Sequence, residues 1–188
     1  MTEAYQETFK EQDFSQQVLQ DRTFEECHFI QCDFSKASLN KSLFRECIFT
    51  DCNFSNVHFP DTSFQEVRFE QCKLMGLDFS TCRPLLLEMA FQQCRIDLCT
   101  FRNIKMKKTP FSHCELIECD FYEVDLEAAD FSLTNLRGTR FEQVNLKKAD
   151  FRGAQHYDFN PLNNPIQKAK FSYPEVLVFL KDFQIDIE

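Results

Sequence analysis

The fold is decided by a segment that occurs twice, FEECHFIQCDF at residues 24–34 and FRECIFTDCNF at residues 44–54. Within each copy, Phe stands at every fifth position, and Cys stands two residues before the second and the third Phe. The two copies lie twenty residues apart, which equals four five-residue units. A period of five inside a period of twenty indicates a repeat architecture.

The period of five extends over most of the chain. It matches neither the 3.6 residues per turn of an amphipathic helix nor the alternation of a strand. The register starts at Phe9, shifts once after Phe79, and resumes at Phe91. The central residues are Phe9, Phe14, Leu19, Phe24, Phe29, Phe34, Leu39, Phe44, Phe49, Phe54, Phe59, Phe64, Phe69, Leu74 and Phe79, then Phe91, Ile96, Phe101, Met106, Phe111, Leu116, Phe121, Leu126, Phe131, Leu136, Phe141, Leu146 and Phe151.

A coil that turns a corner every five residues explains this pattern. Four units then complete one turn, and the strands of successive turns stack about 4.8 Å apart. The central residue of each unit points into the coil, where burial stabilises the fold by about 1.5–3 kcal/mol per side chain. We therefore expect an all-β fold, a right-handed quadrilateral parallel β-helix.

Two residues before each central residue lies a second position that we expect to face inward. Side chains such as Ala37, Val57 and Thr62 occupy it, and all ten Cys fall on it when the first register is extended to Cys82. Because Ala, Val and Thr stand at the same position elsewhere, we interpret the Cys as small buried hydrophobic residues. No zinc site or disulfide is expected.

The register shift lies between residues 80 and 90. A two-residue bulge there lets a column of inward Cys that begins at Cys32 continue past the shift to Cys114. A seven-residue loop would also restore the Cys motif at Phe91, but it would break that column. We therefore prefer the small bulge.

Composition limits the possible functions. A formal charge of −9 argues against direct binding of nucleic acid, whose phosphates require a basic surface. The first twenty residues contain no apolar stretch suited to a signal peptide, and no segment approaches the roughly 20 apolar residues of a membrane span. We expect a cytoplasmic protein with reduced thiols and no membrane contact.

At these repeats the chain resembles the pentapeptide-repeat family, whose unit is a small residue, Asn or Asp, Leu or Phe, and two variable residues. The stretch ADFRG at residues 149–153 is a near-perfect copy of that unit. The resemblance spans residues 9–153. The first small positions, Glu7, Gln12, Gln17 and Arg22, depart from the pattern, so the first turn is expected to be irregular or a partial cap.

We divide the chain into residues 1–154, the β-helix, and residues 155–188, a turn-rich connection and a helix. Pro and Asn dominate residues 157–165, which is typical of turns. Pro174 and Glu175 suit the first turn of a helix. Its apolar residues, expected either to cap the last coil or to form a homodimer interface, are Val176, Leu177, Phe179, Leu180 and Phe183.

The tail is also similar to those of gyrase-interacting pentapeptide proteins, of the quinolone-resistance (Qnr), albicidin-resistance and microcin-immunity types. The stretches NPLNN at residues 160–164 and KAKFSYPE at residues 168–175 carry this likeness. It implies a dimer through the C-terminal segment. It also implies a rod that imitates duplex DNA, binds DNA gyrase or another type II topoisomerase, and protects that enzyme from poisons.

Two groups of acidic residues are candidates for such a surface. The first, the acidic ladder, consists of residues at matching positions of successive turns, which repel one another at a spacing of about 4.8 Å. The second lies in a stretch without Lys or Arg between Lys108 and Arg137. An ordinary solvated face explains both groups equally well. The ladder is Glu26, Glu46, Glu66 and Glu88, and the second group is Glu115, Glu118, Asp120, Glu123, Asp125, Glu127 and Asp130.

No catalytic site or cofactor is predicted. The four His residues are scattered, and three Gly are too few for a phosphate-binding loop. Two hypotheses remain: a DNA mimic that binds gyrase, and a pentapeptide scaffold that binds another protein, since the fold alone does not define a partner.

Overall fold

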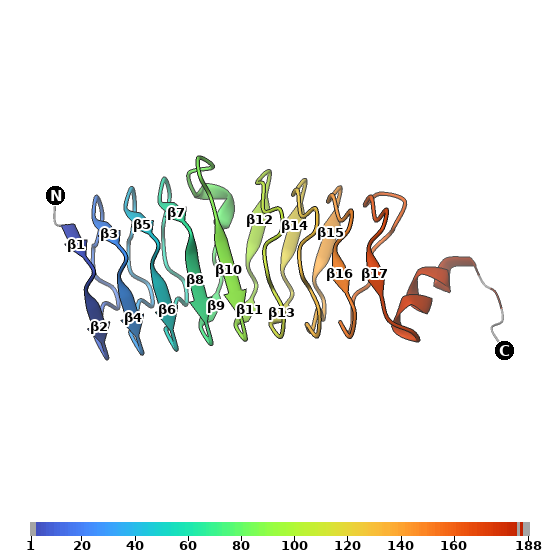
Figure 1. Cartoon of the computed structure of the whole chain (residues 1–188), viewed down its shortest axis with the longest axis horizontal. Coiled ribbons are helices and arrows are strands. Elements are labelled where there is room, and N and C mark those ends of the chain that lie inside the picture. Colours follow the sequence, from blue (N-terminus) through green and yellow to red (C-terminus); the bar gives the residue numbers. More distant parts are fainter. Residues whose placement is uncertain (1–2, 184, 186–188) are drawn as a thin grey trace.

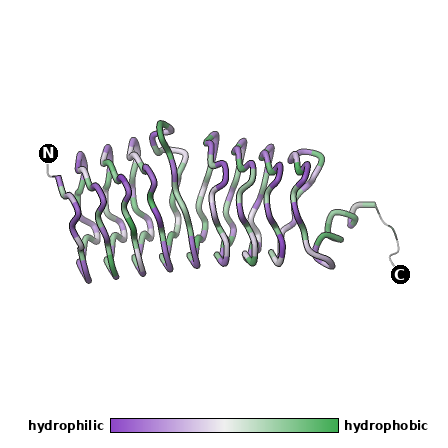
Figure 2. The backbone as a smooth tube through the Cα atoms, viewed as in Figure 1, coloured by the Kyte–Doolittle hydropathy of each residue, from purple (hydrophilic) through white to green (hydrophobic). Residues whose placement is uncertain are grey.

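The computed structural model describes residues 3–183 and 185 as a long rod of stacked coils (Figure 1). The rod is a right-handed quadrilateral parallel β-helix of about eight turns, which confirms the expected fold class. The described N- and C-terminal segments lie at opposite ends of the rod. Short hydrophilic and hydrophobic stretches alternate along every coil (Figure 2), as a narrow core with four solvated sides requires.

Short parallel strands join each coil to the next, and one 3-10 helix, η1 (Phe79–Thr81), interrupts them. Phe24 pairs with Phe44, and Phe44 with Phe64, so residues twenty apart lie directly above one another. The strands are β1 (Glu3–Tyr5), β2 (Thr8–Lys10), β3 (Thr23–Glu25), β4 (His28–Ile30), β5 (Leu43–Arg45), β6 (Ile48–Thr50), β7 (Ser63–Gln65), β8 (Val67–Glu70), β9 (Lys73–Met75), β10 (Met89–Gln92), β11 (Arg95–Asp97), β12 (Thr100–Arg102), β13 (Glu115–Ile117), β14 (Asp120–Tyr122), β15 (Arg140–Glu142), β16 (Asp150–Phe151) and β17 (Lys170–Phe171).

The corners of the coil are made by left-handed backbone. The residue two positions after nearly every central residue has a positive φ, for example 52° at Glu26 and 54° at Gln31. Such a conformation costs a non-Gly residue about 1–2 kcal/mol. The same residues donate backbone hydrogen bonds to the next coil, Glu26 to the carbonyl of Arg45 at 2.9 Å and Gln31 to that of Thr50 at 2.9 Å. Pairing between coils offsets the cost of each corner.

One side of the core is a continuous column of stacked Phe rings. Each ring lies almost parallel to the next, with centroids 4.7–5.3 Å apart and interplanar angles of 4–14°. All but the two end rings are fully buried. The column therefore connects the first coil to the last, through Phe9, Phe29, Phe49, Phe69, Phe91, Phe111, Phe131, Phe151 and Phe171.

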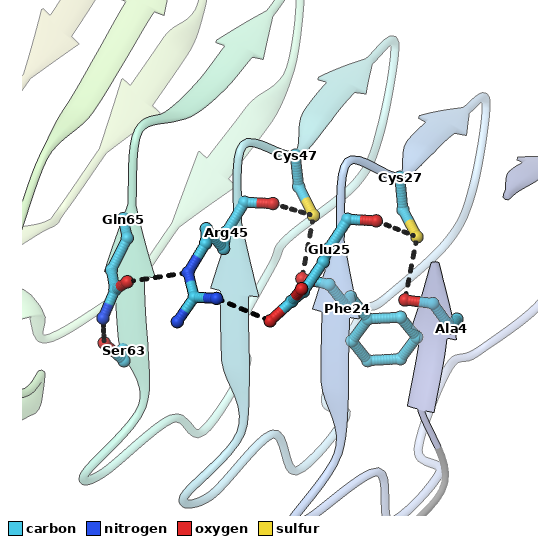
Figure 3. Close-up of polar contacts among 8 residues, drawn as sticks. All are labelled: Ala4, Phe24, Glu25, Cys27, Arg45, Cys47, Ser63 and Gln65. Atoms are coloured by element: carbon cyan, nitrogen blue, oxygen red, sulfur yellow. Dashed lines mark hydrogen bonds and ion pairs between the residues drawn. The ribbon is translucent and has the colours of Figure 1, made fainter. Parts of the chain in front are cut away.

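The Cys side chains fill the second inward position. All ten are free and buried. The Cys47 thiol donates to the carbonyl of Phe24 at 3.3 Å, and the Cys27 thiol donates to those of Ala4 and Glu25 (Figure 3). Burial raises the pKa of Cys47 to about 12. These thiols act as small core residues that bond to the backbone.

The register shift is absorbed by one bulging loop. Val67 pairs with Met89, an offset of 22 residues instead of 20. The Phe column continues across it, since the rings of Phe69 and Phe91 stack at 5.3 Å. The extra residues form the green loop that rises beside β10 in Figure 1. Leu85 and Leu86 in this loop are 74% and 67% exposed.

The first coil carries polar residues at its small inward positions. Glu7, Gln12 and Gln17 stand at the inward small position but are exposed. The Gln12 amide donates to the carbonyl of Lys10 at 2.9 Å, and the Gln17 amide donates to that of Asp13 at 2.6 Å. These side chains bond to the backbone at an edge that would otherwise attract another strand.

Coil pairing continues beyond residue 154, where the sequence-based division ended the rod. Phe151 pairs with Phe171 through β16 and β17. The buried Asn164 occupies an inward position, where its amide donates to the carbonyl of Phe141 at 3.0 Å and accepts from the N–H of Val144 at 2.9 Å. Counted by fives from Phe151, the next two central positions are His156 and Pro161, so the run of apolar central residues ends before this coil.

A 3-10 helix, η2 (Glu175–Phe183), follows the last coil. Val178 and Phe179 pack against the core from the C-terminal end. The helix therefore caps the rod. Among the described residues, no helix has the length and apolar content that crossing a bilayer requires.

We predict that Phe111→Ala destabilises the protein by about 3–5 kcal/mol, because it removes a fully buried ring that stacks on Phe91 and Phe131. Phe111→Leu should cost less, since Leu116 and Leu126 hold equivalent positions in neighbouring columns. Urea unfolding measures both. An alanine variant as stable as the parent would contradict the role of the Phe column.

Candidate functional site

The acidic ladder lies on one corner of the rod. Glu26, Glu46 and Glu66 all have left-handed backbone, with φ of 52°, 53° and 55°. They follow β3, β5 and β7, whose pairing register places them one above another. All three are exposed. The rigid corner therefore holds three carboxylates in a row with a rise of about 4.8 Å.

The neighbouring cation does not neutralise the ladder. Arg45 donates to the Glu25 carboxylate at 2.7 Å and to the Gln65 amide oxygen at 3.1 Å, as Figure 3 shows. Within residues 3–183, no salt bridge involves Glu26, Glu46 or Glu66.

Neutral groups contact the first rung of the ladder instead. The Gln6 amide donates to Glu26 at 2.8 Å. The pKa of Tyr5 is raised, first by a hydrogen bond to Glu26 and then by the charge of that carboxylate. A row of carboxylates with neutral neighbours leaves the corner negatively charged.

Glu88 lies beside the ladder but on different backbone. Its N–H donates to the carbonyl of Phe64, and its carbonyl accepts from Val67, so it stands next to Glu66. The left-handed residue of this coil is Leu86, with φ of 57°. Glu88 is exposed at the base of the bulging loop. The fourth carboxylate therefore extends the row without sharing its corner conformation.

Beyond the loop, the same corner changes sign. The positions equivalent to Glu66 in the later coils are Lys108, Ala128, Lys148 and Lys168, with φ of 60–63°. The acidic row is thus confined to the N-terminal half of the rod. The change of sign is encoded in the twenty-residue register, because Lys108 stands twenty residues after Glu88.

The second acidic group does not form one surface. Its members lie in consecutive five-residue units and therefore spread over all four sides of the coil. Cations from neighbouring coils neutralise several of them. The salt bridges are Asp120 with Arg102 (2.6 Å) and Arg140 (3.7 Å), Asp125 with Lys107 (3.3 Å), and Glu127 with Lys107 (2.9 Å) and Lys148 (2.6 Å).

The members without salt bridges among the described residues fall in three different five-residue units, two of them in the same one. They are Glu115, Glu118, Glu123 and Asp130. The absence of Lys and Arg in the local sequence was misleading, because the partners stand about twenty residues away.

The tail residues divide into two sets. The ring of Phe179 packs within its own chain, 5.1 Å from that of Phe159 and 5.2 Å from that of Phe171 between centroids. Val176 and Leu177 are half-buried. Leu180 and Phe183 are 36% and 68% exposed. Of the five predicted interface residues, only Leu180 and Phe183 expose much apolar surface.

Metal-binding geometry is not evident in the described part of the chain. No group of three or more His, Cys, Asp or Glu residues there could hold a metal ion. His156 shares a hydrogen bond with Asn135 at 3.0 Å.

We predict that Glu127 stays ionised down to about pH 2. The hydrogen bond from Lys148 and then that from Lys107 lower the pKa of this exposed carboxyl to about 2. Its stabilising contribution is present above the unfolded pKa and is lost as pH falls through the folded value. NMR titration should show the midpoint moving toward 4.5 in Lys148→Met. The control Lys168→Met should leave it unchanged, and a wild-type midpoint near 4.5 would contradict the pairing.

Comparison with protein-family models agrees with this architecture. The model of the pentapeptide repeat region matches residues 22–85 and 82–151. No curated protein sequence matches the chain. Solved structures with a similar fold include QnrB1, described as a plasmid-mediated fluoroquinolone resistance protein, in a trypsin-treated form. QnrB1 has 17% identity, 99% of this chain and 100% of that chain covered, and a TM-score of 0.49.

Two further solved structures are similar. HetL, a pentapeptide repeat protein involved in heterocyst differentiation regulation in the cyanobacterium Nostoc sp., has 13% identity, coverage of 89% and 82%, and a TM-score of 0.36. A pentapeptide repeat protein from the Arabidopsis thaliana thylakoid lumen has 21% identity, coverage of 63% and 67%, and a TM-score of 0.31. Because the family model spans most of the sequence, this chain belongs to the pentapeptide-repeat family.

Proposed function

We propose that the chain is a non-catalytic cytoplasmic binding protein that presents its acidic ladder to a basic protein surface. The proposed partner is a type II topoisomerase, DNA gyrase, whose DNA-binding surface the rod occupies in place of duplex DNA. Occupation of that surface protects the enzyme from an antibiotic or toxin that acts on its complex with cleaved DNA. The protein then confers resistance or self-immunity.

The ladder carries this proposal. One strand of DNA has one charge per about 3.4 Å of helix axis, and the ladder has one per about 4.8 Å, roughly two-thirds of that density. Like charges directly opposite one another destabilise a sheet, so folding alone does not favour such a row. Arg45 could reduce the repulsion between the ladder carboxylates, but it pairs with Glu25 instead.

The dimensions of the rod fit a DNA-sized surface. About eight turns at about 4.8 Å give a length on the order of 38 Å. A homodimer through the C-terminal segment would roughly double it. We propose that Leu180 and Phe183 form the centre of this dimer, because they remain exposed after Phe179 has capped the last coil.

A second candidate is a scaffold that binds another protein and has no topoisomerase role. The change of sign at Lys108 supports this candidate. A uniform DNA mimic needs negative charge along its whole length, whereas this corner is acidic in one half and basic in the other. A partner whose own charge changes sign would fit it better.

We predict that the triple variant Glu26→Gln, Glu46→Gln, Glu66→Gln folds normally and binds gyrase about tenfold more weakly or worse, with a reduced dependence on salt. Protection of supercoiling activity against a gyrase poison should fall in parallel. The control Glu115→Gln, Glu123→Gln, Asp130→Asn removes the same charge from separated sites. If the ladder variant binds and protects like wild type, the topoisomerase proposal is wrong and the scaffold takes its place.

We predict that Leu180→Asp with Phe183→Asp yields a monomer in sedimentation velocity at concentrations where the wild type is a dimer. Two buried carboxylates would make the proposed interface unfavourable. Leu133→Asp serves as the control, because Leu133 is exposed at a corner of the rod outside the C-terminal segment. An unchanged sedimentation coefficient in the tail variant would exclude a dimer centred on these residues.

A further inference from the structure

The charges on the side of the rod that carries the ladder are arranged in opposite order on either side of the bulging loop. We call this surface the ladder side and define it by the outward residues of 23–26, 43–46 and 63–66 before the loop and of 105–108, 125–128 and 145–148 after it. Backbone pairing links each of these segments to its neighbour within the same half. Each segment is therefore one rung of the same surface.

The column of left-handed corner residues reverses its charge about the loop. Counted outward from Leu86, the preceding rungs carry Glu66, Glu46 and Glu26. The following rungs carry Lys108, Ala128 and Lys148. Carboxylates at the first and third rungs thus correspond to ammonium groups at the first and third rungs of the other half.

The adjacent column, one residue earlier in each unit, reverses in the same way. Outward from the loop, the preceding rungs carry Gln65, Arg45 and Glu25, and the following rungs carry Lys107, Glu127 and Lys147. In this column the charge at the second rung has opposite sign in the two halves, with Arg45 before the loop and Glu127 after it. The third rung again sets a carboxylate against an ammonium group.

Two copies of the ladder side become complementary in charge when a two-fold axis relates them. The axis runs across the ladder side, perpendicular to the rod and in the plane of contact, at the level of the loop. Rotation about such an axis brings two copies face to face and antiparallel, with each column opposite itself in reverse. On the three rungs before and after the loop, no residue of the two columns then meets a like charge, and Glu88 at the loop is the carboxylate that lies nearest the axis. The opposite-charge pairs between the copies are Glu66 with Lys108, Arg45 with Glu127, Glu25 with Lys147, and Glu26 with Lys148.

An apolar centre lies where the axis would pass. Leu85 and Leu86 project from the loop into solvent. Beside them is a groove of about 760 Å³, which contains Leu87, Met89 and Met106 between the ladder and the lysines. Two exposed Leu side chains next to such a groove match the apolar centre and charged rim of a protein interface.

From this arrangement we infer that the ladder side binds a second copy of this chain, antiparallel and side by side, with Leu85 and Leu86 of each copy in the groove of the other. The charge order favours a second copy over another protein, because the same surface supplies both halves of every pair. The inference does not depend on the proposed topoisomerase partner. If both hold, side-by-side pairing covers the ladder and keeps the protein in a form that cannot bind that partner.

The test uses full-length chains that also carry Leu180→Asp and Phe183→Asp, so that a tail dimer does not contribute. Variant one adds Glu26→Lys and Glu66→Lys, and variant two adds Lys108→Glu and Lys148→Glu. Lys already occupies left-handed corners at residues 36, 41 and 108, so these changes suit the backbone. Each variant alone faces like charges and should self-associate at least about tenfold more weakly than the parent.

An equimolar mixture of the two variants restores every opposite-charge pair and should form a one-to-one complex in sedimentation velocity. Combining all four charge changes in one chain should restore self-association. Leu85→Asp with Leu86→Asp should weaken the parent without changing its urea midpoint. A parent that is monomeric up to about 0.5 mM, or variants that associate equally alone and mixed, would overturn the inference and leave the side to a different partner.

Discussion

The whole structure depends on the stacking of inward side chains at intervals of twenty residues. Each inner Phe ring of the main column contacts the rings above and below it at about 5 Å, so each coil is stabilised largely by its neighbours. Backbone pairing between coils follows the same register. Even the bulging loop leaves this column intact, because Phe91 stacks on Phe69 across it.

Because of this constraint, outward residues twenty positions apart in the sequence form rows along the surface of the rod. The residue two positions after nearly every central residue adopts left-handed backbone at a corner of the coil, whatever its type. Surface residues with no role in the core are therefore placed at the same spacing as the core residues. The acidic ladder and the lysines that follow it are two parts of one such row. Their function depends on which binding partner contacts them.

Much of the fold could be predicted from the sequence, because Phe and Leu at every fifth position fit neither an amphipathic helix nor an alternating strand. The last coil could not, since His156 and Pro161 interrupt the run of apolar central residues, and Asn164 fills its inward position through hydrogen bonds. The candidate site could be predicted from the sequence only in part. The ladder follows from the register, but the neutralisation of Glu127 by Lys107 and Lys148 depends on contacts between coils that a local window does not include.

Removal of one coil tests the central claim, that a twenty-residue register places every core and surface residue. Deleting residues 31–50 joins Ile30 to Asp51, which then takes the place of Gln31. Deleting residues 31–49 instead puts every later residue one position out of register. Urea unfolding should give a single cooperative transition near the wild-type midpoint for the first variant, and loss of that transition for the second. Equal stability of the two variants would contradict the account.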